Sequence, residues 1–214
     1  MAEPRPSVLI VDDDPDMREA LVSLLRSVDL EAKASASVPE FLKIPLPAGP
    51  TCLVLDVRLP GQSGLDFQRE LSAANVDLPI IFITAHGDIP MSVRAMKAGA
   101  VEFLTKPIRD QDLLDAIQLA LARDRARRKN ARSLAVLQER FETLTPRERE
   151  VMGKILKGRL NKQIAFDIGV TEATVKYHRG QVMHKMKASS LLDLGHMAEK
   201  LKLTPETLQA WTGP

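Results

Sequence analysis

Aspartates gather where two apolar runs in the first half of the chain end. One run is followed at once by Asp12, Asp13 and Asp14, and another ends in Asp56. Neighbouring carboxylates repel one another unless a cation lies among them or one has a separate task. Asp14 stands directly before a proline, which favours the first helical position, so it is best explained as a helix N-cap. The other three offer the oxygen ligands that a hard divalent cation prefers, Mg²⁺ first and Mn²⁺ as an alternative.

Two further polar residues, Thr84 and Lys106, also follow apolar runs. In an open parallel sheet, ligands bind beyond the carboxyl ends of the strands, so these side chains and the carboxylates would converge there. A phosphoryl group held by the cation could then be attacked by Asp56, giving an aspartyl phosphate. Lys106 would neutralise one phosphoryl oxygen and the Thr84 hydroxyl would donate to another, while the small Ala85 leaves the approach open.

The segments that must position these residues alternate between strand and helix patterns. Apolar, β-branched runs are separated by amphipathic segments throughout residues 1–122. This alternation predicts an α/β domain with a doubly wound, five-stranded parallel sheet. The strands are expected at residues 8–11, 31–35, 52–56, 79–84 and 101–106.

At these positions the chain resembles the receiver domain of bacterial two-component response regulators, a flavodoxin-like fold. The resemblance covers residues 6–122 and rests on the order, spacing and type of "VDDD", "LDVRLPGQSGLD", "ITAHGD" and "EFLTKP". It implies that Asp56 is the phosphoacceptor and that a sensor histidine kinase donates the phosphoryl group. It also implies that Asp12, Asp13 and the backbone carbonyl of Arg58 complete the magnesium site.

The same resemblance assigns switch and phosphoryl-binding roles. Thr84 and Lys106 match the two phosphoryl contacts, and Phe103 matches the aromatic switch residue that moves together with Thr84. The Lys106–Pro107 bond is expected to be cis, as in the family. Arg58 and His86 flank the site, where they would either tune the lifetime of the phosphate or simply lie exposed.

A hydrolase of the haloacid dehalogenase type also uses a nucleophilic aspartate and Mg²⁺. It needs a second carboxylate two residues later as general acid, and this chain has Arg58 there. We therefore expect no enzyme acting on external substrates: the receiver would catalyse only its own phosphorylation and slow dephosphorylation.

The two halves of the chain carry opposite charge. Residues 1–122 hold 11 basic and 18 acidic residues, a net −7, whereas residues 123–214 hold 19 and 10, a net +9. A basic half is suited to nucleic acid. The single cysteine, Cys52, permits no internal disulfide, and no apolar run is long enough for a membrane span, so a cytoplasmic protein without membrane contact is expected.

The joint between the halves, residues 123–140, is predicted to be a helical linker. Residues 109–144 contain neither glycine nor proline, and residues 123–132 are rich in arginine, which would be solvated or would touch DNA phosphates. Two arrangements stay open: one long helix with a coiled-coil dimer seam, or a linker followed by a helix packed on the second domain. The proposed seam consists of Leu134, Leu137, Phe141 and Leu144.

Residues 141–214 predict a small all-α domain of four helices. Thr145, Pro146 and Glu148 form a capping-box sequence at the start of one helix. Asn161 is expected to cap the next helix and Thr171 the third, around a glycine-containing turn. Helices arranged in this way are typical of a helix-turn-helix.

This half resembles the LuxR-type effector domain over about residues 144–201, so the whole chain resembles the NarL/FixJ class, its FixJ branch in particular. The resemblance implies a homodimer that forms on phosphorylation, binds promoter DNA and regulates, most simply activates, transcription, with RNA polymerase as a further partner. The alternative is a phosphorylation-dependent protein-interaction module that does not bind DNA. The candidate DNA contacts are Lys162, Thr171, Thr174, Lys176, Tyr177, Arg179 and Lys185.

Overall fold

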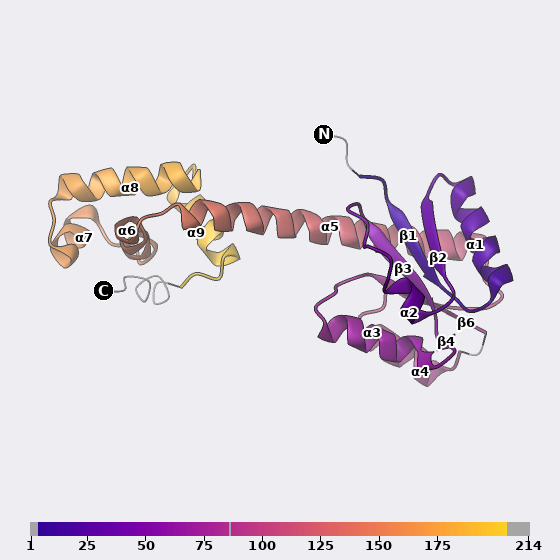
Figure 1. Cartoon of the computed structure of the whole chain (residues 1–214). Helices are drawn as coiled ribbons and strands as arrows, with labels where there is room; N and C mark the ends of the chain where they lie inside the picture. The colour runs from indigo at the N-terminus through magenta and orange to yellow at the C-terminus, as the bar shows by residue number, and fades with distance from the viewer. Residues whose placement is uncertain (1–3, 86, 205–214) are drawn as a thin grey trace. The chain divides into compact units, whose positions relative to one another are not determined.

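The computed structural model describes residues 4–85 and 87–204, which form two compact units (Figure 1). The first unit ends at Arg128 and the second begins at Lys129. This division lies six residues beyond residue 122, the predicted end of the receiver. The physical reason is Asp124, a fully buried carboxylate that keeps the following residues of the chain attached to the first unit.

The first unit contains the predicted five-stranded sheet, with every neighbouring pair parallel and strand order β2-β1-β3-β6-β7. The strand predictions are confirmed to within a residue at most ends. A short antiparallel hairpin, β4 (Arg58–Leu59) with β5 (Gln62–Ser63), was not predicted. The sheet strands are β1 (Ser7–Val11), β2 (Glu31–Ser35), β3 (Thr51–Asp56), β6 (Ile80–Thr84) and β7 (Glu102–Thr105).

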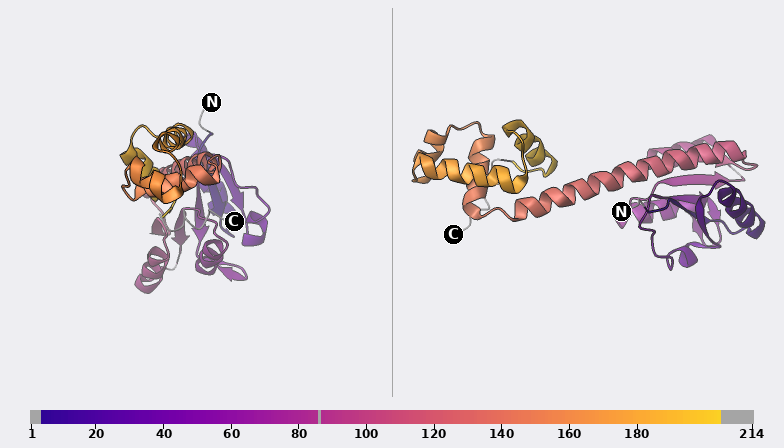
Figure 2. Two further views of the ribbon diagram at one scale, coloured as in Figure 1. Left: turned by 90° about the vertical axis from the view of Figure 1, so that its left-hand side faces the viewer. Right: turned by 90° about the horizontal axis from the view of Figure 1, so that it is seen from above.

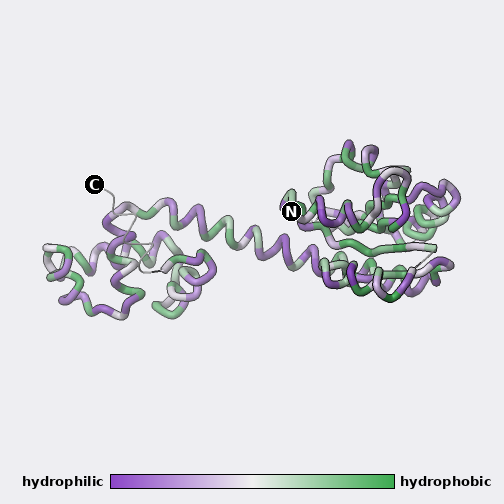
Figure 3. The backbone as a smooth tube through the Cα atoms, turned by 90° about the horizontal axis from the view of Figure 1, so that it is seen from below, coloured by the Kyte–Doolittle hydropathy of each residue, from purple (hydrophilic) through white to green (hydrophobic). Residues whose placement is uncertain are grey.

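Helices cover both faces of the sheet (Figures 1 and 2). Helix α1 (Pro15–Ser27) and the beginning of α5 (Asp110–Glu142) pack on one face, and α2 (Val38–Phe41), α3 (Gly64–Ala73) and α4 (Ile89–Lys97) pack on the other. The central strands β1, β3 and β6 are therefore buried on both faces, which explains their continuous apolar runs (Figure 3).

Local capping chemistry sets the helix starts. Asp14 caps α1 as predicted: its carboxylate accepts hydrogen bonds from the backbone N–H groups of Asp16 and Met17, with Pro15 at the first position. Helix α5 begins at Asp110, with a second acidic residue, Asp112, in its first turn. None of the helices in the described part of the chain combines the length and apolar character of a membrane span.

Helix α5 is continuous through the joint between the halves, as in the predicted arrangement with one long helix. The proposed coiled-coil seam on it is wrong. Leu134 is 41% exposed, but Leu137, Phe141 and Leu144 are buried, and the last two belong to the core of the second unit. Side chains already buried within one chain cannot supply a dimer seam without leaving that core.

The second unit holds the four predicted helices, α6 (Pro146–Leu156), α7 (Asn161–Ile168), α8 (Glu172–Met186) and α9 (Leu191–Lys200). The capping box at Thr145 and Glu148 and the Thr171 cap are confirmed. Asn161 is the first residue of α7 rather than its cap. The backbone N–H of Leu160 instead donates to the Gln163 side chain, which starts the helix one residue earlier than predicted.

Candidate functional site

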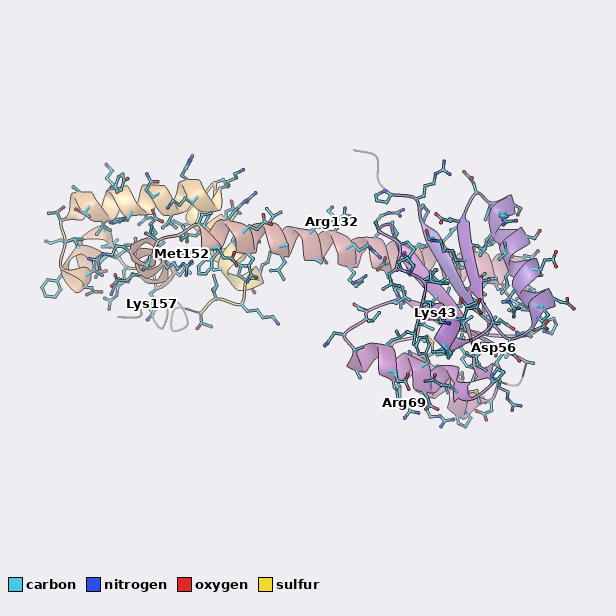
Figure 4. All side chains as sticks on the ribbon, viewed as in Figure 1. Lys43, Asp56, Arg69, Arg132, Met152 and Lys157 are labelled. Carbon is cyan, nitrogen blue, oxygen red and sulfur yellow. The ribbon has the colours of Figure 1, made fainter. Side chains whose placement is uncertain are left out.

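Three carboxylates meet at the carboxyl ends of β1 and β3. Asp12 is 0% exposed, Asp56 is nearly buried and Asp13 is exposed. One ligand oxygen from each lies within 4.8 Å of the others (Asp56 is labelled in Figure 4). Lys106, just beyond β7, donates from Nζ to Asp12 Oδ2 and to Asp56 Oδ2, both at 2.7 Å. The structure thus brings together four of the predicted site residues.

The second carboxylate oxygens of Asp12 and Asp56 are held by the backbone. Asp12 Oδ1 accepts from the N–H of Asp14 and Asp56 Oδ1 accepts from the N–H of Arg58, each at 2.9 Å. The second bond places the Arg58 main chain beside the phosphoacceptor candidate. The Arg58 side chain is exposed, and His86 lies outside the described residues.

Burial and ion pairing act against each other in this cluster. Burial raises the pKa of Asp12, even though the hydrogen bond from Lys106 lowers it. Burial alone would lower the pKa of Lys106, but its hydrogen bonds with Asp12 and Asp56 raise it. Three carboxylates with one ammonium leave an excess of negative charge, and all the donors are oxygens. This set of residues fits a hard divalent cation.

Thr84 lies next to this cluster, and Phe103 lies on β7. Thr84 ends β6, is fully buried, and its backbone oxygen accepts from the Lys106 N–H at 2.8 Å. Phe103 is half-buried, with its ring centroid 6.3 Å from that of Phe82. The Lys106–Pro107 bond is cis, which confirms that expectation.

Sequence reasoning missed Gly87, which lies against both switch candidates. A Cβ added to Gly87 would come within 2.9 Å of Phe103 Cε1, 3.0 Å of Thr105 Cγ2 and 3.3 Å of Thr84 Cγ2. Only glycine lets the backbone approach this closely. The sequence signal that could have identified Gly87 is its position, two residues after the Thr84–Ala85 pair.

In the second unit, the candidate nucleic-acid contacts gather around the start of α8. The Thr171 hydroxyl accepts from the Thr174 N–H at 3.2 Å and pairs with the Thr174 hydroxyl at 2.8 Å. Arg179 donates from Nη1 to Asn161 Oδ1 at 3.1 Å, which links α8 to the first turn of α7. Lys176 and Tyr177 are exposed, the latter to 63%. Lys162, on the first turn of α7, is also exposed.

Lys185 is directed into the unit rather than toward solvent. Its Nζ donates to the buried Glu148 carboxylate at 2.6 Å and to the Thr143 carbonyl at 3.2 Å. Burial would raise the pKa of Glu148, but the hydrogen bonds from Lys185 and the Thr145 N–H hold it below its usual range. This pairing gives Lys185 a structural role, which the sequence did not suggest.

The comparisons with known proteins decide what the two units are. Residues 8–118 match the family model of the response regulator receiver domain, and residues 142–209 match the luxR family of bacterial regulatory proteins. The chain belongs to the response regulators. This response regulator pairs a receiver unit with a LuxR-type DNA-binding unit, as its sequence predicted.

Its relatives cover the same two units. The chain is 55% identical over 197 residues to Nodulation protein W of Bradyrhizobium diazoefficiens, covering 92% of this chain and 87% of that protein. It is 41% identical to the transcriptional regulatory protein FixJ of Azorhizobium caulinodans, covering 89% of this chain and 90% of FixJ. Among solved structures, the response regulator StyR is 47% identical, with a TM-score of 0.83 and coverage of 92% and 99%. These relatives make this response regulator FixJ-like, and the family implies a histidine kinase and DNA as partners.

Proposed function

We propose that Asp56 accepts a phosphoryl group from a sensor histidine kinase in a Mg²⁺-dependent reaction, and that the phosphorylated chain dimerises and binds promoter DNA. The supporting observation is that the Lys106 ammonium bridges Asp56 and Asp12 at 2.7 Å. The ammonium thus contacts both the carboxylate that would react and a second carboxylate of the acidic cluster.

In the proposed step, an oxygen of the Asp56 carboxylate attacks the phosphorus of a phosphohistidine. A P–O bond forms, the P–N bond breaks, and the imidazole nitrogen leaves with the electron pair and later takes up a proton. Bound Mg²⁺ would be held by Asp12, Asp13 and Asp56, with the Arg58 carbonyl as a further ligand, and would supply charge stabilisation to the transferring group. Lys106 orients Asp56 before the reaction and neutralises a phosphoryl oxygen afterwards.

The proposed readout begins with Thr84 and Phe103. A new phosphoryl oxygen would draw the Thr84 hydroxyl, and Phe103 would follow into the space this opens. The surface formed by α4 and β7 would change as a result, and dimerisation through it would bring two effector units to half-sites about one DNA turn apart. RNA polymerase would be recruited by the bound dimer. The chain would turn over no external substrate.

An Asp56→Asn variant tests this proposal. With acetyl phosphate and Mg²⁺, the wild type should incorporate one alkali-labile phosphoryl label. The variant should incorporate none. Asp66→Asn, which removes an exposed carboxylate on α3, is the matched control and should be labelled like the wild type. Undiminished labelling of Asp56→Asn would contradict the assignment.

A DNA-binding measurement tests the second half of the proposal. The phosphorylated wild type should select a duplex from a random-sequence pool, with an affinity that falls as salt rises. Failure to bind any duplex even at low salt would favour the alternative of a protein-interaction module.

A further inference from the structure

The carboxylate of Asp124 on α5 is fully buried and takes no part in the site described above. Asp124 Oδ2 accepts from the backbone N–H of Thr51 at 2.8 Å and from Arg128 Nε at 2.5 Å. Asp124 Oδ1 accepts from Arg127 Nε at 3.0 Å and Nη2 at 2.5 Å. These hydrogen bonds outweigh burial, so the pKa of Asp124 is lowered.

The two arginines extend this network to the loops in front of two strands. Arg128 donates from Nη1 to the Ala48 carbonyl at 3.0 Å and from Nη2 to the Pro47 carbonyl at 3.3 Å, in the segment that leads into β3. Arg127 Nε lies 3.8 Å from Asp77 Oδ2, in the loop before β6. We call Asp124, Arg127 and Arg128 the α5 clamp.

The two strands that the α5 clamp reaches are the ones that end at the phosphoacceptor site. β3 begins at Thr51 and ends at Asp56, and β6 ends at Thr84. A strand of six residues is a stiff element about 20 Å long. The α5 clamp therefore binds the first residue of β3 and contacts the loop before β6, at the last residues of α5 that belong to the receiver unit.

Stability alone is a weak reason for this arrangement. A buried ion pair contributes little or nothing relative to apolar residues of the same volume, because the charges lose their hydration. What buried polar groups can provide is a defined geometry, here the place where α5 leaves the sheet. Packed elements and hydrogen-bond networks of this kind can carry coupling between distant sites.

We propose that Asp124 is a positioning residue that fixes the exit of α5 from the receiver unit against β3 and β6, and that phosphorylation raises DNA affinity only while this link is intact. This inference rests on the proposed function, since it concerns how the state of Asp56 reaches the DNA-binding unit.

The test compares three full-length variants with the wild type: Asp124→Asn, Arg128→Gln and, as control, Asp115→Asn, an exposed carboxylate earlier on α5. Each is labelled with acetyl phosphate and Mg²⁺, and its affinity is measured, with and without phosphorylation, for a duplex selected by the phosphorylated wild type. We expect labelling and unphosphorylated affinity to stay at the wild-type level in all three. In Asp124→Asn and Arg128→Gln, the gain in affinity on phosphorylation should fall by about tenfold, while Asp115→Asn keeps it.

A clamp that only stabilises the receiver would give a different result. Asp124→Asn and Arg128→Gln would then unfold at lower temperature but keep the full gain in affinity, and this outcome would overturn the inference. Should Asp124→Asn fail to fold, Arg128→Gln decides, because it leaves the Thr51 and Arg127 bonds to Asp124 in place. Absence of labelling or of DNA binding in the wild type itself would instead refute the proposed function.

Discussion

The Lys106 ammonium and the Asp56 carboxylate are 2.7 Å apart, and the same ammonium is 2.7 Å from Asp12. One cation therefore offsets the repulsion between two nearly buried carboxylates. Removing it exposes that repulsion, which a metal ion could relieve in its place. The balance between the ammonium and the metal leads to two predictions.

Lys106→Gln should lower the free energy of unfolding of the receiver by about 1–3 kcal/mol in the absence of metal, because buried acceptors lose their charged donor. Excess Mg²⁺ should reduce the difference in stability between Lys106→Gln and the wild type. A cation bound to the folded state stabilises it and can offset the carboxylate repulsion in place of the lost ammonium. Urea unfolding with and without Mg²⁺ measures both effects, with Lys97→Gln on α4 as an exposed control. Equal stability of variant and wild type without metal would show that the ammonium does not offset the repulsion.

Asp13→Asn should separate metal binding from folding. Asp13 is exposed, so the loss of its charge should change stability by no more than about 0.5 kcal/mol without metal. The rise in unfolding temperature that Mg²⁺ gives the wild type should be largely lost, because one of three carboxylate ligands is gone. Asp16→Asn, an exposed carboxylate in the first turn of α1, should respond to Mg²⁺ like the wild type. A full Mg²⁺ response in Asp13→Asn would remove Asp13 from the metal site.

The features that the sequence predicted well depend on neighbouring residues. β1, β3 and β6 are continuous apolar runs because both faces of the sheet are covered, and Asp14 and Thr171 cap helices through bonds to residues two or three positions away. The acidic cluster was predictable once the sheet was taken as parallel, because its residues all follow strands.

The features that were missed depend on residues far apart in the chain. Asp124 lies in an arginine-rich stretch that the sequence predicts to be a solvated linker. In the structure its carboxylate is buried and accepts a hydrogen bond from Thr51, 73 positions earlier. Lys185 reads as a phosphate contact, but its partner Glu148 is 37 positions away. No local pattern identifies which charged residue of a helix will meet such a partner.

Gly87→Ala should destabilise the receiver without removing the phosphoacceptor chemistry. The new methyl group would press on Phe103 and Thr105, at 2.9 and 3.0 Å, and overpacking of this kind costs about 1–3 kcal/mol. Asp56 and Lys106 are not touched, so labelling with acetyl phosphate should persist. Gly99→Ala is unsuitable as a control because of its φ of 92°. Ala85→Ser keeps the glycine and should unfold like the wild type. An unchanged free energy of unfolding in Gly87→Ala would mean that the loop yields without strain.

The DNA-binding unit should lose stability in acid through Glu148. The folded-state pKa of this carboxyl is lowered from its ordinary 4.5, so its contribution is complete above that pH and is lost as the pH falls through the folded value. Near neutral pH, the α6 and α8 amides of Glu148→Gln should therefore be less protected from hydrogen exchange than those of the wild type. As the pH falls, their protection should decrease less steeply than in the wild type. Hydrogen exchange on the full chain measures this. Parallel loss of protection in both proteins would show that Glu148 does not carry the acid dependence.

Lys176 and Lys185, both on α8, should respond oppositely to substitution by alanine. Lys176 is exposed, and if it meets a phosphate, Lys176→Ala should weaken binding to all duplexes and reduce the salt slope of log affinity by about 1, with stability unchanged. Lys185→Ala should instead leave the buried Glu148 carboxylate without its partner, which lowers the unfolding temperature while the salt slope stays that of the wild type. Salt titrations of binding and thermal unfolding of the two variants side by side test this assignment. A reduced salt slope in Lys185→Ala, at normal stability, would instead support a contact between Lys185 and a DNA phosphate. The weaker salt dependence would then reflect one counterion fewer released on binding and not the loss of the ion pair with Glu148.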